Sequence, residues 1–223
     1  MGHCLRGTAL KILLALAWLP SSVQADDLPV RIVLFGDSYI ASYGVDSARK
    51  FEVQLESALI ANGQAVEVVG TGYTSTAFRG VDQVKSFLEA EDILGGNGPK
   101  VVILELGSND CGRYKLDETQ ANLETILKAL ADQHIPVLVA GTMPYDMCEN
   151  KDRPNYKALY IQMFADLAAK YGDLYYRDFK EGVGDHPELM QGDRDHPMAD
   201  GDAVIVANIL PSVVELVARA KQP

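Results

Sequence analysis

The chain has 223 residues, a formal net charge of −11 and 48% hydrophobic residues. This length suits one well-buried domain, and no low-complexity tract, repeat or Pro/Gly/Ser-rich linker divides it. Nucleic acids and anionic lipid surfaces are polyanionic, so the negative charge argues against both as partners. The charge otherwise indicates a well-solvated surface.

The first 25 residues have the pattern of a secretory signal peptide. Arg6 and Lys11 precede an apolar run at 12–19, and a polar stretch then ends at Ala25. The run is much shorter than the roughly 20 apolar residues that span a bilayer. We therefore predict cleavage near Ala25, a single domain at 26–223, and a periplasmic or secreted protein without a stable membrane anchor. An uncleaved signal anchor is the alternative.

Short apolar runs alternate with stretches of helical spacing in the predicted mature chain. The runs predict strands at 30–35, 65–69, 101–106, 136–140 and 173–176. Helical spacing occurs at 51–62, 81–94, 118–133, 156–171 and 203–220. This alternation implies parallel strands with helices on both faces. We predict an α/β fold: a three-layer α/β/α sandwich around a mainly parallel five-stranded sheet.

Small and polar residues follow the first three predicted strands. They are Gly36-Asp37-Ser38, then GTGYTS at 70–75, then Gly107-Ser108-Asn109-Asp110. Ligands of such sheets bind beyond the carboxyl ends of the strands, so these loops are expected to converge. Ser38 is the candidate nucleophile, because a serine on a tight strand-to-helix turn presents its hydroxyl beside helix-start amides. Capping of a helix by Asp37 or Ser38 is the alternative.

A nucleophilic serine needs a base, normally histidine, and a group that orients this base. His134 lies where a helix gives way to a strand, at the end of the sheet away from the candidate loops. His186 and His196 both occur in the string Asp-His-Pro. Asp193 lies three residues before His196, whereas Val183 has that place before His186. His196 with Asp193 is therefore the better base pair.

Three blocks resemble, in order, those of the SGNH hydrolases, also called GDSL esterases and lipases: "GDSYIASYGV", "GSND" and "DRDHP". The likeness covers nearly all the mature chain and is closest to the bacterial arylesterase, thioesterase and lysophospholipase branch. It implies a flavodoxin-like SGNH hydrolase fold, with Ser38 as nucleophile, His196 as base and Asp193 as the residue that orients His196.

The resemblance also implies an oxyanion hole, made by the side-chain amide of Asn109 and the backbone N–H of Ser38. Without the family, Asn109 would be a turn residue. A second backbone donor is expected from Ser75, where the family usually has glycine; Gly72 takes this role if the loop is shifted. Tyr39 stands where leucine is usual, and we predict a packing change there.

Cys111 and Cys148 remain after the leader and Cys4 are removed. Export permits a disulfide, and both cysteines follow strands on the side of the sheet that carries the candidate loops. We predict that they are bonded; two free thiols are the alternative.

Three other readings are weaker. Gly70-x-Gly72 after a strand faintly resembles a dinucleotide fingerprint, but the third small position is Ser75 and no acidic residue ends a strand at the required distance. An SGNH fold that only binds ester or glycan is opposed by the intact candidate residues. Asp185, His186, Asp193, Asp195 and His196 are dense in metal-ligand types, but no helical His-x-x-x-His pair occurs, so we predict no metal.

The sequence therefore predicts an exported serine esterase that needs no cofactor. Its expected substrates are small-molecule aryl or short- to medium-chain acyl esters, with thioesters and lysophospholipids as further family activities. Removal of acetyl groups from glycans is the alternative. Acyl-chain length and oligomeric state stay open.

Overall fold

The structure is a computed structural model, and it describes residues 1–2, 28–70, 74–90, 95 and 98–222. Residues 3–25 of the predicted signal peptide and Gly72 lie outside the described residues.

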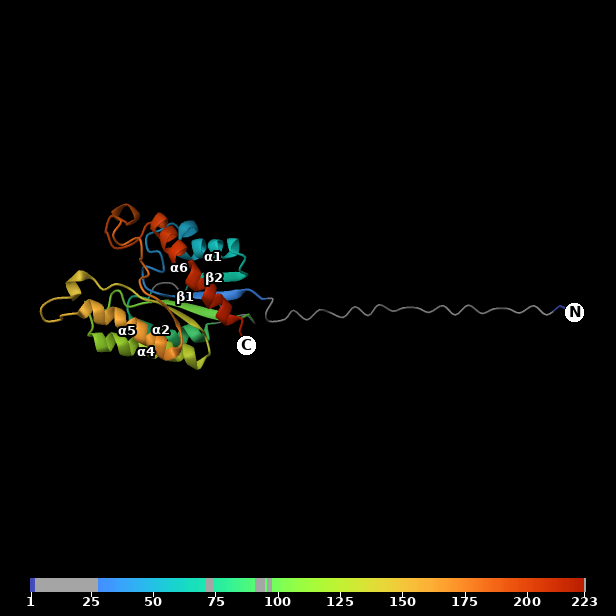
Figure 1. The fold of residues 1–223 in the computed structure, drawn as a ribbon, viewed down its shortest axis with the longest axis horizontal. Helices are drawn as coiled ribbons and strands as arrows, with labels where there is room; N and C mark the ends of the chain where they lie inside the picture. The colour runs from blue at the N-terminus through green and yellow to red at the C-terminus, as the bar shows by residue number, and fades with distance from the viewer. Residues whose placement is uncertain (3–27, 71–73, 91–94, 96–97, 223) are drawn as a thin grey trace.

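A sheet of five parallel strands forms the centre of the fold (Figure 1). The strands are β1 Val30–Gly36, β2 Val66–Gly70, β3 Lys100–Glu105, β4 Val137–Ala140 and β5 Leu174–Tyr176, in the spatial order β2-β1-β3-β4-β5. The predicted parallel α/β sandwich is thereby confirmed, and the strand order is that of flavodoxin-like sheets.

Helices cover both faces of the sheet. On one side lie α1 Phe51–Ala61 and α6 Ala199–Ala220, and on the other lie α2 Ala77–Glu89, α4 Leu116–Asp132 and α5 Tyr156–Tyr171 (Figure 1). Successive β1 side chains alternate between two apolar cores: Ile32 packs under α1 and α6, while Val33 packs on the opposite side. Three short 3₁₀ helices, η2 Ser47–Arg49, η3 Asp146–Cys148 and η4 Pro187–Leu189, lie in the connecting loops.

Helix α6 is long and apolar enough to cross a bilayer by length and composition. In the fold, however, its buried stripe, which includes Ile205, Ile209 and Val213, belongs to the core beneath α1 and the sheet. The stripe recurs at about the helical period, as expected for a helix with one face on a sheet. The fold thus accounts for the apolar character of α6.

The helix predicted at 51–62 is present as α1, but Ser38 does not lie at the start of a helix as expected. Residues 37–44 form successive turns, and the first regular helix, α1, begins only at Phe51. Ser42 has a positive φ of 49°, which ends the helical path after one turn. The hydroxyl of Ser42 then accepts a hydrogen bond from the N–H of Phe51 at 2.7 Å, at the start of α1. The amides beside Ser38 are therefore turn amides.

Candidate active site

The nucleophile turn, named after the candidate nucleophile Ser38 that it carries, begins where β1 and β3 approach each other closely. Gly36 pairs with Glu105, and a Cβ at Gly36 would lie 2.0 Å from the carbonyl oxygen of Glu105. Only glycine fits such an approach. The chain then turns outward, and Ser38 lies just beyond the strand, 7% exposed. Its carbonyl accepts a hydrogen bond from the N–H of Tyr43 at 3.0 Å, which closes the turn.

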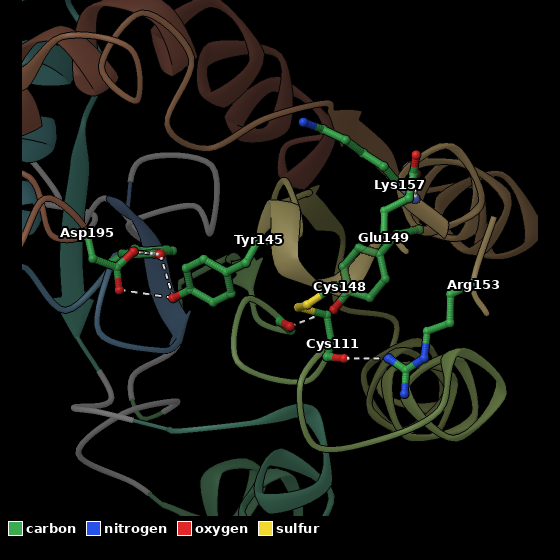
Figure 2. Close-up of a disulfide and its surroundings, with 10 residues drawn as sticks. Cys111, Tyr145, Cys148, Glu149, Arg153, Lys157 and Asp195 are labelled. Carbon is green, nitrogen blue, oxygen red and sulfur yellow. Dashed lines mark hydrogen bonds between the residues drawn. A yellow bond between two sulfur atoms is a disulfide. The ribbon is translucent and has the colours of Figure 1, made fainter. Parts of the chain in front are cut away.

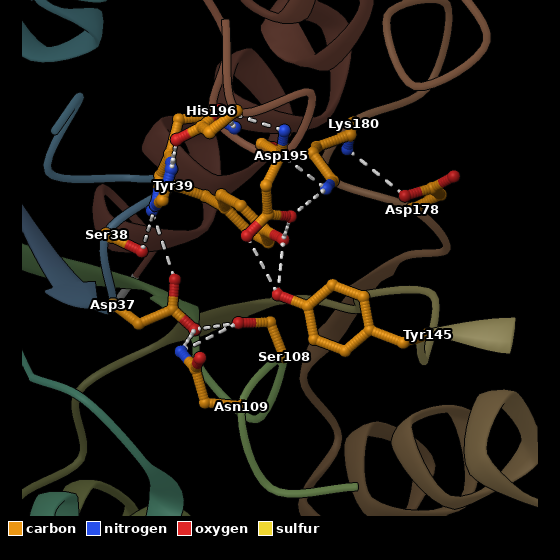
Figure 3. Close-up of polar contacts among 11 residues, drawn as sticks. Asp37, Ser38, Tyr39, Ser108, Asn109, Tyr145, Asp178, Lys180, Asp195 and His196 are labelled. Carbon is orange, nitrogen blue, oxygen red and sulfur yellow. Dashed lines mark hydrogen bonds and ion pairs between the residues drawn. The ribbon is translucent and has the colours of Figure 1, made fainter. Parts of the chain in front are cut away.

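His196 reaches this turn from the loop between η4 and α6. Its Nε2 lies 2.9 Å from Oγ of Ser38 (Figure 3). Its Nδ1 lies 2.7 Å from Oδ2 of Asp193. These two contacts form a continuous hydrogen-bonded chain from carboxylate to imidazole to hydroxyl. The structure thus brings together the three residues that the sequence singled out.

The carboxylate of Asp193 is also held by the backbone of its own loop. Its Oδ1 accepts hydrogen bonds from the N–H groups of Asp195 and His196, at 3.0 and 3.1 Å. The bond from Asp195, followed by the contact with the His196 side chain, lowers the pKa of Asp193 to about 2. Asp193 is consequently a carboxylate at any pH near neutrality and can stabilise a positive charge on His196.

Two backbone N–H groups near Ser38 are available as donors. The N–H of Thr74 donates to the carbonyl of Gly36 at 2.8 Å, which holds the start of the next loop against the end of β1. Within the part of the chain that the structure describes, the N–H groups of Ser38 and Ser75 make no hydrogen bond. Both can therefore receive an acceptor from a bound molecule.

Asn109 lies beside the residue that precedes Ser38. Its amide nitrogen is 3.4 Å from Oδ2 of Asp37 and 3.2 Å from Oγ of Ser108 (Figure 3). Gly107, with a φ of 124° that favours glycine, lies in the bend that leads from β3 into this loop. The position suits an amide donor at the nucleophile turn, and the two contacts fix its orientation.

Three buried carboxyl groups lie at the base of these loops, next to the ends of β1 and β3. Asp37, Glu105 and Asp110 are all 0% exposed. Burial raises the pKa of Glu105 well above its usual range, with the nearby Asp37 adding to the effect. Asp110 accepts a hydrogen bond from the N–H of Ala77 at 3.0 Å, and burial raises its pKa to about 6. Asp110 thereby ties the Asn109 loop to the first residue of α2.

The sequence reading missed a polar cluster next to His196. The hydroxyl of Tyr39 donates to Asp195 at 2.5 Å, and the hydroxyl of Tyr145 donates to the same carboxylate at 3.0 Å. The ammonium group of Lys180 lies 3.5 Å from this carboxylate. We call Tyr39, Tyr145, Lys180 and Asp195 the Asp195 cluster (Figure 3). The prediction that Tyr39 is only a packing change is therefore incomplete; a polar hydroxyl at a usually apolar position was the available signal.

The other two histidines of the predicted mature chain lie elsewhere. Nδ1 of His186 contacts Glu188 at 3.0 Å, and the pair is exposed. His134, with a φ of 55°, lies just beyond the end of α4, away from the candidate loops. Among the described residues, no group of three or more His, Cys, Asp or Glu side chains is placed to hold a metal ion.

Cys111 and Cys148 form a disulfide in the structure, with their Cα atoms 5.8 Å apart (Figure 2). Cys111 follows Asn109 by two residues, and Cys148 follows Tyr145 by three. The bond therefore joins the loop after β3 to the η3 turn after β4. Both of these segments carry residues that contact the site.

An open cavity of about 930 Å³ lies beside the hydrogen-bonded chain. Its lining includes Asp193, Asp195 and Tyr145, and neither Ser38 nor His196 is part of it. Carboxylates are numerous in the lining; they belong to Asp146, Asp178, Glu181, Asp185, Asp193 and Asp195. The cavity thus presents an acidic wall beside Asp193, and Lys157, Lys180 and Arg194 offset part of its negative charge.

Comparisons with known proteins agree on one family. A model of the GDSL-like lipase/acylhydrolase family matches residues 34–204. The esterase TesA of Pseudomonas aeruginosa is 27% identical over 219 residues, which cover 95% of this chain and 100% of that protein. An arylesterase of Vibrio mimicus is 25% identical over 203 residues, which cover 88% of this chain and 93% of that protein.

A solved structure gives the same picture. AlinE4, described as an SGNH-hydrolase family esterase, is 30% identical and superposes with a TM-score of 0.67, covering 84% of this chain and 96% of that chain.

Proposed function

Because the chain belongs to the GDSL-like lipase/acylhydrolase family, we propose that it is an exported serine esterase that cleaves uncharged carboxylic esters through an acyl-enzyme on Ser38. The observation that carries the proposal is the chain of contacts from Asp193 through His196 to Ser38, at 2.7 and 2.9 Å. These distances lie within the range in which a base can take the proton of a nucleophile.

In the first half-reaction, Oγ of Ser38 attacks the ester carbonyl carbon while Nε2 of His196 takes the hydroxyl proton. The carbonyl oxygen becomes an oxyanion, which accepts hydrogen bonds from the N–H groups of Ser38 and Ser75 and from the amide of Asn109. When the carbon–oxygen bond to the leaving group breaks, His196 gives its proton to the departing alkoxide. An acyl-serine and a free alcohol result.

In the second half-reaction, a water molecule attacks the acyl carbon and His196 takes a proton from it. The second oxyanion collapses, the bond to Oγ of Ser38 breaks, and His196 returns the proton to the serine. The carboxylic acid leaves. Throughout, Asp193 stays ionised and stabilises the imidazolium that forms twice in each cycle.

Charge and exposed rings at the site support neutral esters as substrates. The acidic wall of the cavity opposes a carboxylate or phosphate on the substrate. The ring of Tyr43 is 63% exposed and lies 5.2 Å from that of His196. The exposed Phe78 packs on Tyr114 at 5.7 Å, near the loops of Ser75 and Asn109. These rings can contact an aryl or short alkyl group.

Deacetylation of glycans is a second candidate. The cavity beside Asp193 is lined by carboxylates together with Lys157, Lys180 and Arg194. The carboxylates can accept hydrogen bonds from sugar hydroxyls, and the lysine and arginine side chains can donate hydrogen bonds to them. Action outside the cytoplasm is part of either proposal; the signal-peptide pattern and the disulfide support it.

The test is hydrolysis of p-nitrophenyl esters, acetate through dodecanoate, by the mature chain and by Ser38→Ala. We expect activity on the short esters and a loss to background in the variant. Ser57→Ala, which removes an exposed hydroxyl on α1, is the matched control and should keep full activity. Equal turnover by Ser38→Ala and the native chain would contradict the proposal. Hydrolysis of acetylated polysaccharide without turnover of the aryl series would favour the second candidate.

A further inference from the structure

The carboxylate of Asp195 is held by side chains from three separate loops. Tyr39 follows β1, Tyr145 follows β4, and Lys180 follows β5. The hydroxyl of Tyr39 donates to Oδ1 at 2.5 Å, and the hydroxyl of Tyr145 donates to Oδ2 at 3.0 Å. Both carboxylate oxygens of Asp195 therefore have a donor, and the two hydroxyls lie 3.2 Å from each other.

Lys180 completes the cluster from the other side. Its ammonium group lies 3.3 Å from the backbone carbonyl of Asp195 and 3.5 Å from its Oδ1. It also lies 3.8 Å from the centre of the Tyr39 ring, within the range of a cation–π contact. The side chain of Lys180 is only 16% exposed, so its positive charge is partly desolvated. It therefore attracts the negative charge of Asp195 more than an exposed lysine would.

The cluster connects a largely exposed loop to the interior of the fold. Tyr39 is 2% exposed and packs in the core beneath α1 and α6. Asp193, by contrast, has a side chain that is 46% exposed, and Arg194 between the two aspartates has a φ of 59°. A short exposed turn of this kind has few packing contacts of its own to keep it in place. Hydrogen bonds to buried side chains supply that restraint.

The restraint passes directly to the base. The backbone N–H of Asp195 donates to Oδ1 of Asp193, and Oδ2 of Asp193 holds Nδ1 of His196. A displacement of Asp195 would therefore turn the carboxylate that sets the plane of the imidazole. A second anchor of the same loop is Gln191, whose side-chain amide donates to the carbonyls of Tyr43 and Pro197. The Asp195 cluster thus anchors the residue directly before His196, and Gln191 anchors the residue directly after it.

We propose that Tyr39, Tyr145 and Lys180 act through Asp195 as positioning residues, which keep Asp193 and His196 aligned on Ser38. Tyr39 has this role at the position where family members usually carry an apolar residue. The inference rests on the proposed esterase function and extends it to residues that do not touch the substrate. Burial and the bond to Asp195 raise the pKa of Tyr39, so that its hydroxyl stays a donor throughout the working pH range.

The first test compares Tyr39→Phe, Tyr145→Phe and Asp195→Asn with the native chain on p-nitrophenyl acetate. Small misplacements of catalytic groups cost up to about 10²-fold in rate, and we expect each variant to lose about tenfold in kcat with KM changed less than about twofold. Tyr175→Phe is the matched control: it also removes one tyrosine hydroxyl, which donates to the carbonyl of Ile161 at 3.2 Å in another part of the fold. Its kcat should stay native.

A second measurement separates positioning from a general loss of stability. The proton on Nδ1 of His196, held by Asp193, should give a downfield resonance in the proton spectrum. We expect Tyr39→Phe and Asp195→Asn to shift or broaden this resonance at temperatures at which the variants are fully folded. Tyr175→Phe should leave the resonance in place. We also expect Tyr39→Phe to add no further loss of kcat in the Asp195→Asn background, because the hydroxyl acts through that carboxylate.

Two results would overturn the inference. One is native kcat in Tyr39→Phe and Asp195→Asn; the other is an unchanged His196 resonance in these variants. Failure of the proposed function looks different: the native chain would then hydrolyse none of the esters, or Ser38→Ala would hydrolyse them equally well.

Discussion

In the proposed oxyanion hole, Asn109 and Ser75 would act through different atoms, so substitutions at the two positions should differ. Asn109 offers a side-chain amide, whereas Ser75 offers a backbone N–H that every residue except proline retains. We predict that Asn109→Ala lowers kcat by about 10²–10³ with little change in KM, because one donor to the oxyanion is lost. Steady-state kinetics on p-nitrophenyl acetate measure this, with Asn62→Ala, at the exposed end of α1, as control.

The comparison at position 75 follows from the same reasoning. Ser75→Ala keeps the N–H and should retain nearly native kcat, while Ser75→Pro lacks the N–H and should lose as much as Asn109→Ala. A large loss in Ser75→Ala would show instead that the hydroxyl takes part.

Asp202 makes the stability of the fold depend on pH. It is fully buried in the first turn of α6, and burial raises its pKa from 3.8 to about 7. Between these values the unfolded chain ionises this group while the folded chain keeps its proton, so stability falls as pH rises from about 4 to about 7. Above about pH 7 the penalty is complete and constant.

We therefore predict that Asp202→Asn raises the free energy of unfolding near pH 8, by at most about 4 kcal/mol, and has little effect near pH 4. Urea unfolding at the two pH values measures the difference. Asp200→Asn, in the same turn but exposed, should show no such trend. A variant Asp202→Asn that is less stable than the native chain near pH 8 would contradict the prediction.

The disulfide joins two connecting segments that the sheet alone does not fix to each other. Its cysteines are 37 residues apart in sequence, and closure of a loop of this length stabilises a fold by about 3–4 kcal/mol. We predict a loss of this size in the double variant Cys111→Ser/Cys148→Ser, measured by urea unfolding. Reductant should destabilise the native chain and leave the double variant unchanged. Two free thiols in the unfolded, unreduced native chain would refute the prediction.

Strands were predictable to within one residue at every end. The interior strands β1, β3 and β4 are buried on both faces and therefore appear as nearly continuous apolar runs. Helix starts were less predictable. The helix expected from Val81 begins at Ala77, because Thr76 accepts from the N–H of Arg79 and Asp110 accepts from the N–H of Ala77. The second of these caps comes from another loop, which local sequence does not reveal. The last part of the expected range, 91–94, lies outside the described residues.

The candidate site divides in the same way. Asp193 and His196 lie three residues apart, so their contact could be expected from local spacing. The turn after the first strand made Ser38 a candidate, and the ordered family blocks added Asn109. The Asp195 cluster could not be expected, because its members come from four loops that meet only when the sheet has formed. A tyrosine in place of the usual leucine at position 39 was its sole trace in the sequence.

The net charge of −11 affects the whole surface, and with it the approach of substrates. We predict that an aryl ester with a carboxylate on its acyl chain, p-nitrophenyl hemisuccinate, has a kcat/KM about tenfold below that of p-nitrophenyl butyrate at low salt. Raising the ionic strength to about 0.5 M should narrow this gap, because salt screens charges beyond a few ångströms. Rates on the butyrate should stay constant and serve as the control. A gap that does not depend on salt would place the discrimination in the shape of the site.

The disulfide also has a consequence for when the enzyme becomes competent during its life in the cell. A newly made chain in a reducing cytosol carries two thiols, and the loops of Asn109 and Tyr145 are then not tied together. The bond would form in an oxidising compartment, so under the proposed export the finished site would belong to chains that have already crossed the membrane. Esters and acyl thioesters of the producing cell would thus meet the loosely assembled enzyme, and only external substrates would meet the completed one.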